Sequence, residues 1–323
     1  MEYRYSGHSG VQLPVISLGL WHNFGDVDDF DVATQMVLTA FDNGICHFDL
    51  ANNYGPSPGS AEINFGRILR KNLQNHRDEM FISSKAAHRM WDGVYGDGGS
   101  RKNLIASCDQ SLKRTGLEYF DVFYCHRYDG ITPVEESVQA LIDIVRQGKA
   151  LYAGISKFPY AEQQLAYQLL KEAKVPCLLS QYRCSMFDTK AQKENFQLAF
   201  DSGSGIICFS PLAQGLLSGK YNNGIPENSR ANKETGFLQP SEVTKTRVDA
   251  AIQLTEIAQR RGQSLAQMAL AWILNDKRVT SVIIGTSSVG QLESNLHTLD
   301  NTSFSDEELK EINLVISDEA VSF

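Results

Sequence analysis

Eight short apolar runs, each followed by a segment of helical character, constrain the fold more than any other feature of this sequence. The runs are centred near residues 16, 47, 82, 123, 152, 179, 207 and 283. Strands that alternate with helices pair in parallel, and eight such units can close on themselves. The pattern therefore predicts the α/β class and a (β/α)8 TIM barrel, built as a single domain over residues 1–323.

An open, doubly wound sheet is the alternative architecture. Such a sheet would carry a glycine-rich fingerprint after its first strand. The segment Gly19-Leu20-Trp21-His22 has no such spacing, so the barrel is favoured. Residues 3–13 alternate around a glycine-bearing turn and predict an N-terminal β-hairpin. The stretch 211–242 is too long for a plain connection and is expected to form a long irregular loop.

Composition narrows the classes of partner. The chain is 42% hydrophobic and 21% charged, with a formal net charge of −8 and no basic cluster. These values are typical of a soluble globular protein and argue against nucleic acid or an anionic membrane surface. No apolar run approaches the roughly 20 residues of a membrane span, and residues 1–5 show no signal region. The six cysteines form no CxxC pair, which favours reduced, buried thiols in a cytoplasmic protein.

Three consecutive predicted strands end in polar side chains that could work together. Asp49, Lys85 and His126 stand at the ends of the second, third and fourth strands, and Tyr54 follows in the first of these loops. Active residues of such barrels lie at the carboxyl ends of the strands. We therefore expect these four side chains to meet at one mouth.

This combination suits proton transfer to a carbonyl oxygen. Tyr has a reference pKa of about 10, and a nearby ammonium lowers that pKa by favouring the phenolate. Asp49 would hold Lys85 charged and in place, and His126 could orient the carbonyl oxygen. Because no side chain is an evident nucleophile, another group must attack the carbon.

Other interpretations of the same residues are less specific. Asp49 and Lys85 could form a purely structural ion pair, and His47 fits a core histidine better than a ligand. Together with Asp49 and His126, His47 could also suggest a metal hydrolase. Such a site needs about three or four ligands, and the eighth strand ends in Gly285-Thr286 without a carboxylate.

Several motifs along the chain fit one family. They are Phe48-Asp49, Tyr54-Gly55, Ala61-Glu62, Phe65-Gly66, Lys85, His126, Gly154-Ile155-Ser156, the run from Ser210 to Tyr221, and Val282-Ile283-Ile284-Gly285. From about residue 3 to 317 the chain resembles the aldo-keto reductase superfamily. Segments 21–25, 51–56 and 90–96 are similar to the bacterial L-glyceraldehyde 3-phosphate reductase branch. That branch is kin to the voltage-gated potassium channel β-subunits.

The resemblance implies an enzyme that transfers a hydride from NADPH to an aldehyde, with Tyr54 as the acid. It implies that Ser156 and Gln181 hold the nicotinamide and that the long loop folds over the cofactor. The full set of cofactor-binding positions is Trp21, Ser156, Gln181, Ser210, Leu212, Gly215, Lys220, Arg230, Ser287, Gln291 and Asn295. In this set the backbone at Ser210, Leu212 and Gly215 wraps the pyrophosphate, Arg230 meets the 2′-phosphate, and Ser287, Gln291 and Asn295 meet the adenosine.

Two positions depart from the family pattern. Cys184 stands where an aromatic ring usually stacks on the nicotinamide. Ser294 stands where relatives often carry Glu near the adenine.

The branch resemblance points to small aldehydes, with L-glyceraldehyde 3-phosphate first and methylglyoxal second. Trp21 and Trp91 would narrow the mouth, and Arg127 would recognise a substrate phosphate, with Arg89 and Arg101 nearby. A non-enzymatic alternative remains, namely an NADPH-binding regulatory subunit that senses redox state with little turnover. The sequence also leaves a homo-oligomer open.

Overall fold

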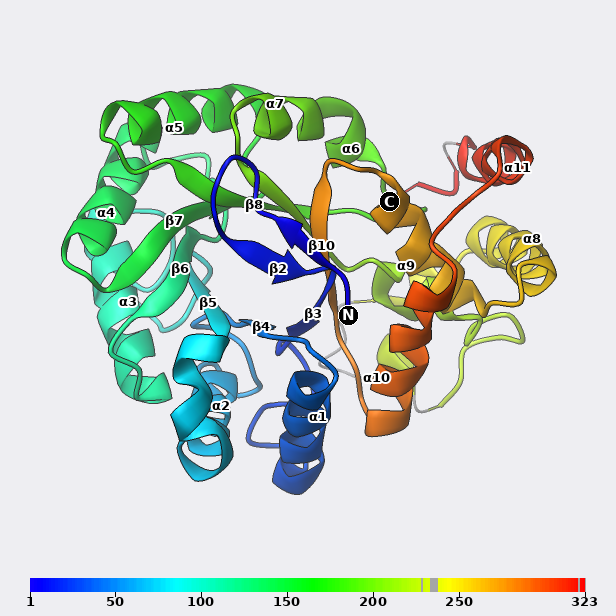
Figure 1. Cartoon of the computed structure of the whole chain (residues 1–323), viewed down its shortest axis with the longest axis horizontal. Coiled ribbons are helices and arrows are strands. Elements are labelled where there is room, and N and C mark those ends of the chain that lie inside the picture. Colours follow the sequence, from blue (N-terminus) through cyan, green and yellow to red (C-terminus); the bar gives the residue numbers. More distant parts are fainter. Residues whose placement is uncertain (228, 233–237, 319, 323) are drawn as a thin grey trace.

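A closed barrel of eight parallel strands forms the centre of the protein (Figure 1). The computed structural model describes residues 1–227, 229–232, 238–318 and 320–322. Around the barrel the strands follow the order β10-β3-β4-β5-β6-β7-β8-β9, which confirms the predicted TIM barrel. Their bounds are β3 (Ile16–Gly19), β4 (His47–Asp49), β5 (Phe81–Ala86), β6 (Phe120–Cys125), β7 (Ala150–Ser156), β8 (Cys177–Arg183), β9 (Gly205–Phe209) and β10 (Val279–Ile284).

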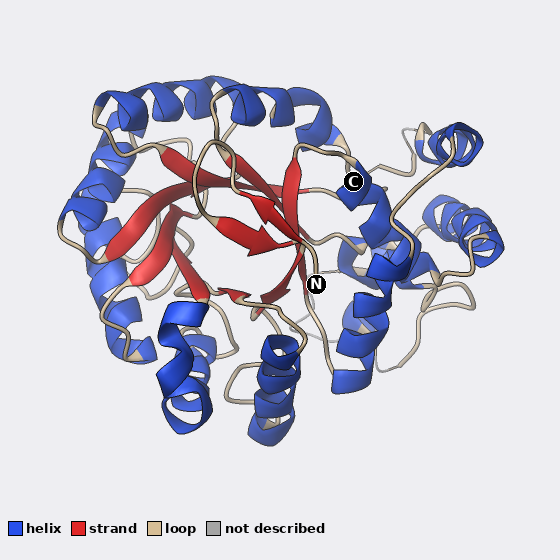
Figure 2. Ribbon diagram, viewed as in Figure 1, coloured by secondary structure: helices blue, strands red, loops and turns tan. Residues whose placement is uncertain are grey.

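Helices surround the strands on the outside (Figure 2). Their apolar faces pack on the barrel, and α8 and α11 lie side by side beyond this ring, joined by the ion pair of Arg260 and Glu311. The helices are α1 (Phe30–Asp42), α2 (Ser60–Ile68), α3 (Arg101–Thr115), α4 (Val134–Arg146), α5 (Tyr160–Glu172), α6 (Lys190–Glu194), α7 (Phe196–Asp201), α8 (Lys245–Arg260), α9 (Leu265–Asn275), α10 (Val289–Leu296) and α11 (Asp306–Ile316). None of the helices within the described ranges is long and apolar enough to cross a membrane.

Two helices differ from the simple periodic pattern. The sequence predicts one helix over about 60–72, but the α-helical part ends at Ile68 and continues as the π-helical turn η1 (Leu69–Leu73). The sequence likewise predicts one helix over about 190–201, but α6 and α7 are divided at Asn195, whose carbonyl accepts a hydrogen bond from Gln163 Nε2. The same carbonyl also accepts from the backbone N–H of Ala199 at 3.1 Å, so the contact with Gln163 adds to the helical bonding, and periodicity does not encode it.

The N-terminal hairpin closes one end of the barrel. Its strands β1 (Tyr3–Tyr5) and β2 (Gln12–Pro14) pair antiparallel, as predicted. Arg4 Nη1 donates to the carbonyl of Val279 at 2.9 Å, and Ser6 Oγ donates to the carbonyl of Leu178 at 2.8 Å. These carbonyls lie where β10 and β8 begin, so the hairpin covers the amino ends and leaves the carboxyl ends for a site (Figure 1).

Gly66 sets the distance between α2 and α3. A Cβ atom at this position would lie 2.3 Å from the carbonyl oxygen of Thr115 and 2.7 Å from its carbonyl carbon. Both atoms belong to the backbone, so a larger residue would have to push the helices apart.

We expect Gly66→Ala to lower the free energy of unfolding by about 1–3 kcal/mol, because overpacking forces backbone shifts. Gly290→Ala in α10 is the matched control, since its Cβ would meet no described atom within 4 Å. That change should leave stability unchanged or raise it by roughly 0.5–1 kcal/mol. Urea unfolding of both variants measures the difference, and equal stabilities would contradict the packing argument.

Candidate active site

The barrel brings the four predicted catalytic side chains together. Asp49 ends β4, Lys85 lies next to the end of β5, and His126 directly follows β6. Asp49 pairs in register with Ser83, two residues before Lys85, so the strand ends meet at the same edge. All four side chains are buried, Tyr54 among them in the loop after β4.

Lys85 links the other groups through its ammonium. Its Nζ lies 2.6 Å from Asp49 Oδ2, 2.6 Å from the carbonyl oxygen of Leu50 and 3.3 Å from Tyr54 Oη. An ammonium has three N–H donors and no acceptor, so these contacts use all three. The Tyr54 oxygen therefore accepts from Lys85, and its own hydroxyl hydrogen is directed elsewhere.

Asp49 is held by a second set of hydrogen bonds. Its Oδ1 accepts from Ser83 Oγ at 2.7 Å and from Gln181 Nε2 at 3.1 Å. Ser83 Oγ also lies 3.2 Å from Nε2 of His47, whose Nδ1 is 2.8 Å from Ser17 Oγ. His47 is thus a buried core histidine, as expected, and it supports the carboxylate indirectly through Ser83.

Burial governs protonation at this site. Desolvation, followed by the charge of Asp49, raises the pKa of Tyr54 well above its ordinary value. This direction is opposite to the one expected from Lys85 alone, because burial disfavours the phenolate. Burial also lowers the pKa of Lys85, and the Asp49 carboxylate opposes that shift.

His126 is a neutral imidazole at neutral pH. Burial and then the charge of Lys85 lower its pKa well below the ordinary range. Its ring meets the Tyr54 ring edge to face at 5.9 Å, and Trp21 lies 6.3 Å from Tyr54 on centroid distances. Its Nδ1 is buried and has no hydrogen-bond partner among the described residues.

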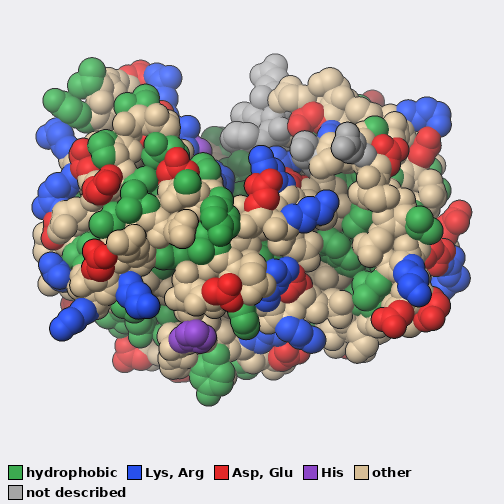
Figure 3. Space-filling model, turned by 90° about the horizontal axis from the view of Figure 1, so that it is seen from above, with side chains coloured by type: hydrophobic (Ala, Val, Ile, Leu, Met, Phe, Trp, Pro, Cys, Tyr) green, Lys and Arg blue, Asp and Glu red, His purple; other side chains and the backbone are tan. Residues whose placement is uncertain are grey.

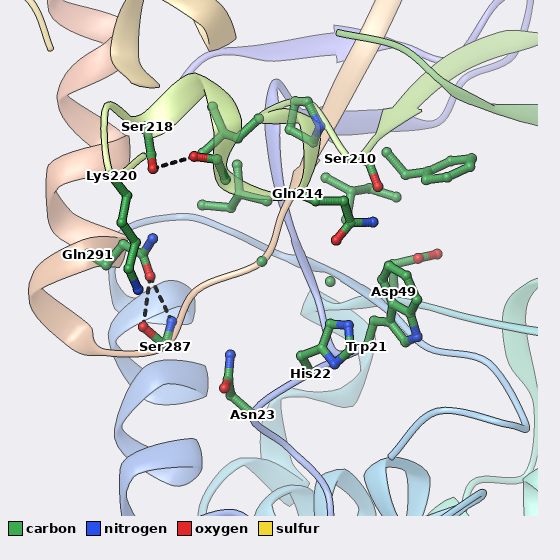
Figure 4. Close-up of a pocket in the computed structure, with 18 of the residues that line it drawn as sticks. Trp21, His22, Asn23, Asp49, Ser210, Gln214, Ser218, Lys220, Ser287 and Gln291 are labelled. Atoms are coloured by element: carbon green, nitrogen blue, oxygen red, sulfur yellow. Dashed lines mark hydrogen bonds between the residues drawn. The ribbon is translucent and has the colours of Figure 1, made fainter. Parts of the chain in front are cut away.

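A long cleft leads away from Tyr54 and Asp49. It holds about 1220 Å3 of empty space, including solvent at its open side. In Figure 4, Trp21 and Asp49 lie at one end, Ser210 and Gln214 between, and Lys220, Ser287 and Gln291 at the other end. Seven of the predicted cofactor positions line it: Trp21, Ser210, Leu212, Gly215, Lys220, Ser287 and Gln291.

The cleft has features that fit a dinucleotide. Ser210, Ala213 and Gln214 have positive φ angles of 53°, 48° and 60°, and Gly215 has 105°. Successive residues of this kind form backbone nests that bind anions such as phosphate. An elongated cleft with such a segment at its middle suits a pyrophosphate between two ring-bearing ends.

Three further predicted cofactor positions are buried near strand or helix ends, outside the lining of the cleft: Ser156, Gln181 and Asn295. Ser156 Oγ and Asn295 Nδ2 find no partner in the part of the chain that the structure describes. Buried polar atoms are normally paired, so each is suited to a polar group that a ligand brings. The side chain of Arg230 lies outside what the structure describes.

Comparison with known proteins identifies the fold's family. Residues 15–316 match the sequence model of the Aldo/keto reductase family. The chain belongs to the aldo/keto reductase family. It is accordingly an NAD(P)-dependent oxidoreductase. It is also 52% identical over 322 residues to proteins named L-glyceraldehyde 3-phosphate reductase from Escherichia coli O157:H7 and Escherichia coli strain K12. Each alignment covers 98% of this chain and 93% of the relative.

Only one of the two tryptophans predicted to contact the substrate of this aldo/keto reductase lines the cleft, and the predicted arginine already has partners in the protein. Trp21 lines the cleft, whereas Trp91 is half-buried in the loop after β5 and is not among the described residues that line it. Arg127 donates from Nε to the carbonyl of Ala87 at 3.0 Å and from Nη2 to Asp97 at 2.8 Å. Its role toward a phosphate stays a prediction.

The other two arginines considered for a phosphate are already paired. Arg89 forms an ion pair with Asp92, and Arg101 forms one with Asp143. In this aldo/keto reductase both guanidinium groups thus have acidic partners on the surface.

Three residues near the cleft were not predicted from the sequence. Gln214 lines it, and His88 and Lys157 contact each other beside His126. Lys157 directly follows Ser156 at the end of β7, so the strand-end argument that found Asp49 could have found it. His88 lies in a loop, and its position depends on geometry that no pattern gives.

His47 gives this aldo/keto reductase a pH-dependent term in stability. Burial lowers its pKa from 6.5 to about 4 in the folded protein. As the pH falls below 6.5 the unfolded chain binds a proton that the folded protein does not, so stability is lost toward pH 4. The term is fully present above pH 6.5.

Between pH 7 and pH 4.5, wild type should lose about 2 kcal/mol more free energy of unfolding than His47→Asn does. The size follows from the pKa shift of His47, because one pKa unit corresponds to about 1.36 kcal/mol. Urea unfolding at both pH values gives the two losses. The same change at His297, an exposed residue, is the control. Identical losses in wild type and His47→Asn would exclude this contribution.

Proposed function

We propose that this protein reduces small aldehydes to alcohols, with NADPH as hydride donor and Tyr54 as proton donor. The observation that carries the proposal is the contact of Lys85 Nζ with both Asp49 and Tyr54 at the closed end of the cleft. The two relatives are named L-glyceraldehyde 3-phosphate reductase, which supports an aldehyde as substrate.

Tyr54 supplies the proton. Its raised pKa keeps the phenol protonated in the resting site, and its hydroxyl hydrogen is not used toward Lys85. NADPH, when bound, supplies the hydride to the carbonyl carbon. As the carbonyl oxygen gains negative charge, Tyr54 protonates it, and the charge left on the phenol oxygen is met by the Lys85 ammonium. Asp49 keeps that ammonium in position.

His126 orients the substrate. Because its imidazole is neutral, one ring nitrogen carries a hydrogen that can be donated to the carbonyl oxygen. The ring lies beside Tyr54, so both donors can reach the same oxygen. Trp21 contributes an apolar wall on the other side of Tyr54, which favours small substrates.

The remaining positions suit the two ends of the cofactor. Ser156 and Gln181 would hold the nicotinamide carboxamide, and the buried Ser156 Oγ, which has no hydrogen-bond partner among the described residues, supports this assignment. The backbone from Ser210 to Gly215 would wrap the pyrophosphate. Ser287, Gln291 and Asn295 would meet the adenosine, and Lys220 at the far end of the cleft, together with Arg230, would favour NADPH over NADH through the 2′-phosphate.

Among aldehydes, we propose L-glyceraldehyde 3-phosphate first and methylglyoxal second. The first choice follows from the names of the two relatives. The second is a small aldehyde of the kind that the apolar wall of the cleft admits.

We expect Tyr54→Phe to bind NADPH as wild type does and to lose about 10²–10⁴-fold in kcat, because a positioned acid contributes that factor. Steady-state kinetics with an aldehyde panel and fluorescence titration of NADPH measure the two properties. Tyr5→Phe, an exposed tyrosine of the hairpin, is the matched control and should keep its activity.

Near-normal turnover in Tyr54→Phe would remove Tyr54 as the acid. A wild-type protein that binds NADPH tightly but reduces none of the aldehydes would instead favour the regulatory alternative, in which the bound cofactor reports redox state.

A further inference from the structure

A lysine and a histidine meet beside the proposed proton donor. Lys157 Nζ lies 2.7 Å from Nε2 of His88. The His88 ring contacts the His126 ring edge to face at a centroid distance of 4.5 Å, and His126 contacts Tyr54. Lys157 therefore stands two rings away from the phenol, at the mouth of the barrel.

Lys157 is bonded to a histidine, whereas the arginines at this mouth are paired with carboxylates. Arg89, Arg101 and Arg127 each pair with an aspartate. No carboxylate of the described residues lies within 4.0 Å of Lys157 Nζ. Its hydrogen bond goes to an imidazole nitrogen, Nε2 of His88. Its positive charge is therefore not neutralised by a neighbouring acid.

The protonation states leave donors available at Lys157. Burial, followed by the charge of Lys157, lowers the pKa of His88 to about 4, so its ring is neutral and Nε2 accepts. Lys157 is an exposed residue, yet partial loss of solvent around its ammonium, followed by the charges of Lys85 and Arg127, lowers its pKa to about 8, so the ammonium remains mostly protonated at pH 7. One of its three N–H groups points to His88, and the other two can bind an anion.

The backbone presents this pair in uncommon conformations. Lys157 has a φ of 55° and Ala87, directly before His88, has a φ of 125°. Residues with side chains rarely adopt such angles, and they persist where the surrounding structure holds them, often at ligand sites. Arg127 Nε donates to the carbonyl of Ala87 and so holds the segment that carries His88.

The surface at this end of the molecule is hollowed. In the space-filling view the molecule is hollowed at its upper edge, and the left wall of the hollow carries both Lys or Arg and Asp or Glu side chains (Figure 3). An anion here would meet the Lys157 ammonium, which has no carboxylate beside it among the described residues.

We propose that Lys157, held by His88, is the subsite that binds the phosphate of a phosphorylated aldehyde while the carbonyl lies between Tyr54 and His126. This inference rests on the proposed aldehyde reduction and assigns the phosphate to Lys157, not to Arg89 or Arg101. Binding at a group remote from the carbonyl positions the aldehyde and can raise the rate as well as the affinity.

The test compares the kcat/KM values of glyceraldehyde 3-phosphate and glyceraldehyde in wild type and in Lys157→Met. We expect wild type to prefer the phosphorylated aldehyde by at least about tenfold, and Lys157→Met to lower that ratio about tenfold or more, since charge-assisted hydrogen bonds are the stronger ones. Lys157→Arg should keep most of the preference. Lys245→Met, at an exposed lysine of α8, is the matched control and should leave the ratio unchanged.

Binding without turnover gives a second measure. Glycerol 3-phosphate should inhibit glyceraldehyde reduction more strongly than glycerol does in wild type, and Lys157→Met should abolish that difference. His88→Leu, which removes the acceptor that holds the ammonium, should lower the substrate ratio severalfold. Circular dichroism and thermal unfolding verify that each variant is folded.

The outcomes separate the subsite from the reaction. A wild-type enzyme that reduces both aldehydes equally well overturns the phosphate subsite and leaves the proposed function standing. A preference that survives Lys157→Met and His88→Leu also overturns it. If wild type reduces neither aldehyde with NADPH, both the proposed function and the subsite are wrong.

Discussion

The buried ion pair of Asp49 and Lys85 is the interaction on which the site depends. Removing two charges from water costs several kcal/mol per ion unless hydrogen bonds replace the lost solvent. Here Asp49 accepts from Lys85, Ser83 and Gln181, and Lys85 donates to Asp49, Leu50 and Tyr54. Because a buried salt bridge is weak evidence for stability, we interpret this satisfied pair as a device that fixes the Tyr54 oxygen at the closed end of the cleft.

The strand-end residues could be predicted because parallel strands of similar length finish at one edge. Asp49, Lys85 and His126 needed only strand limits and parallel pairing, and the structure brings them together as expected. The direction of the Tyr54 pKa could not be predicted, because burial outweighs the neighbouring ammonium and burial is a property of the closed barrel. Asn195, at the boundary of α6 and α7, likewise bonds to Gln163 on another helix, a contact that no sequence spacing gives.

The partners of the cations at the mouth of the barrel could not be predicted from sequence patterns. Arg89 and Arg127 were expected there from their closeness in sequence to Lys85 and His126, yet each finds an aspartate in a loop. Lys157 directly follows the end of β7, where the strand-end argument could have found it, and its hydrogen-bond partner is a histidine. Loop geometry decides which cation can reach a substrate. That geometry depends on contacts such as the hydrogen bond from Arg127 to the carbonyl of Ala87.

The most direct measurement compares stability and hydride transfer in the double variant Asp49→Asn/Lys85→Met, which removes both charges and leaves neither unpaired. If the pair serves the chemistry, the double variant should unfold within about 2 kcal/mol of wild type, because neutral replacements of buried pairs are often tolerated. Its single-turnover reduction of glyceraldehyde by NADPH should then fall by about 10²-fold or more. A double variant that unfolds readily, or one that reduces the aldehyde at nearly the wild-type rate, would contradict the account.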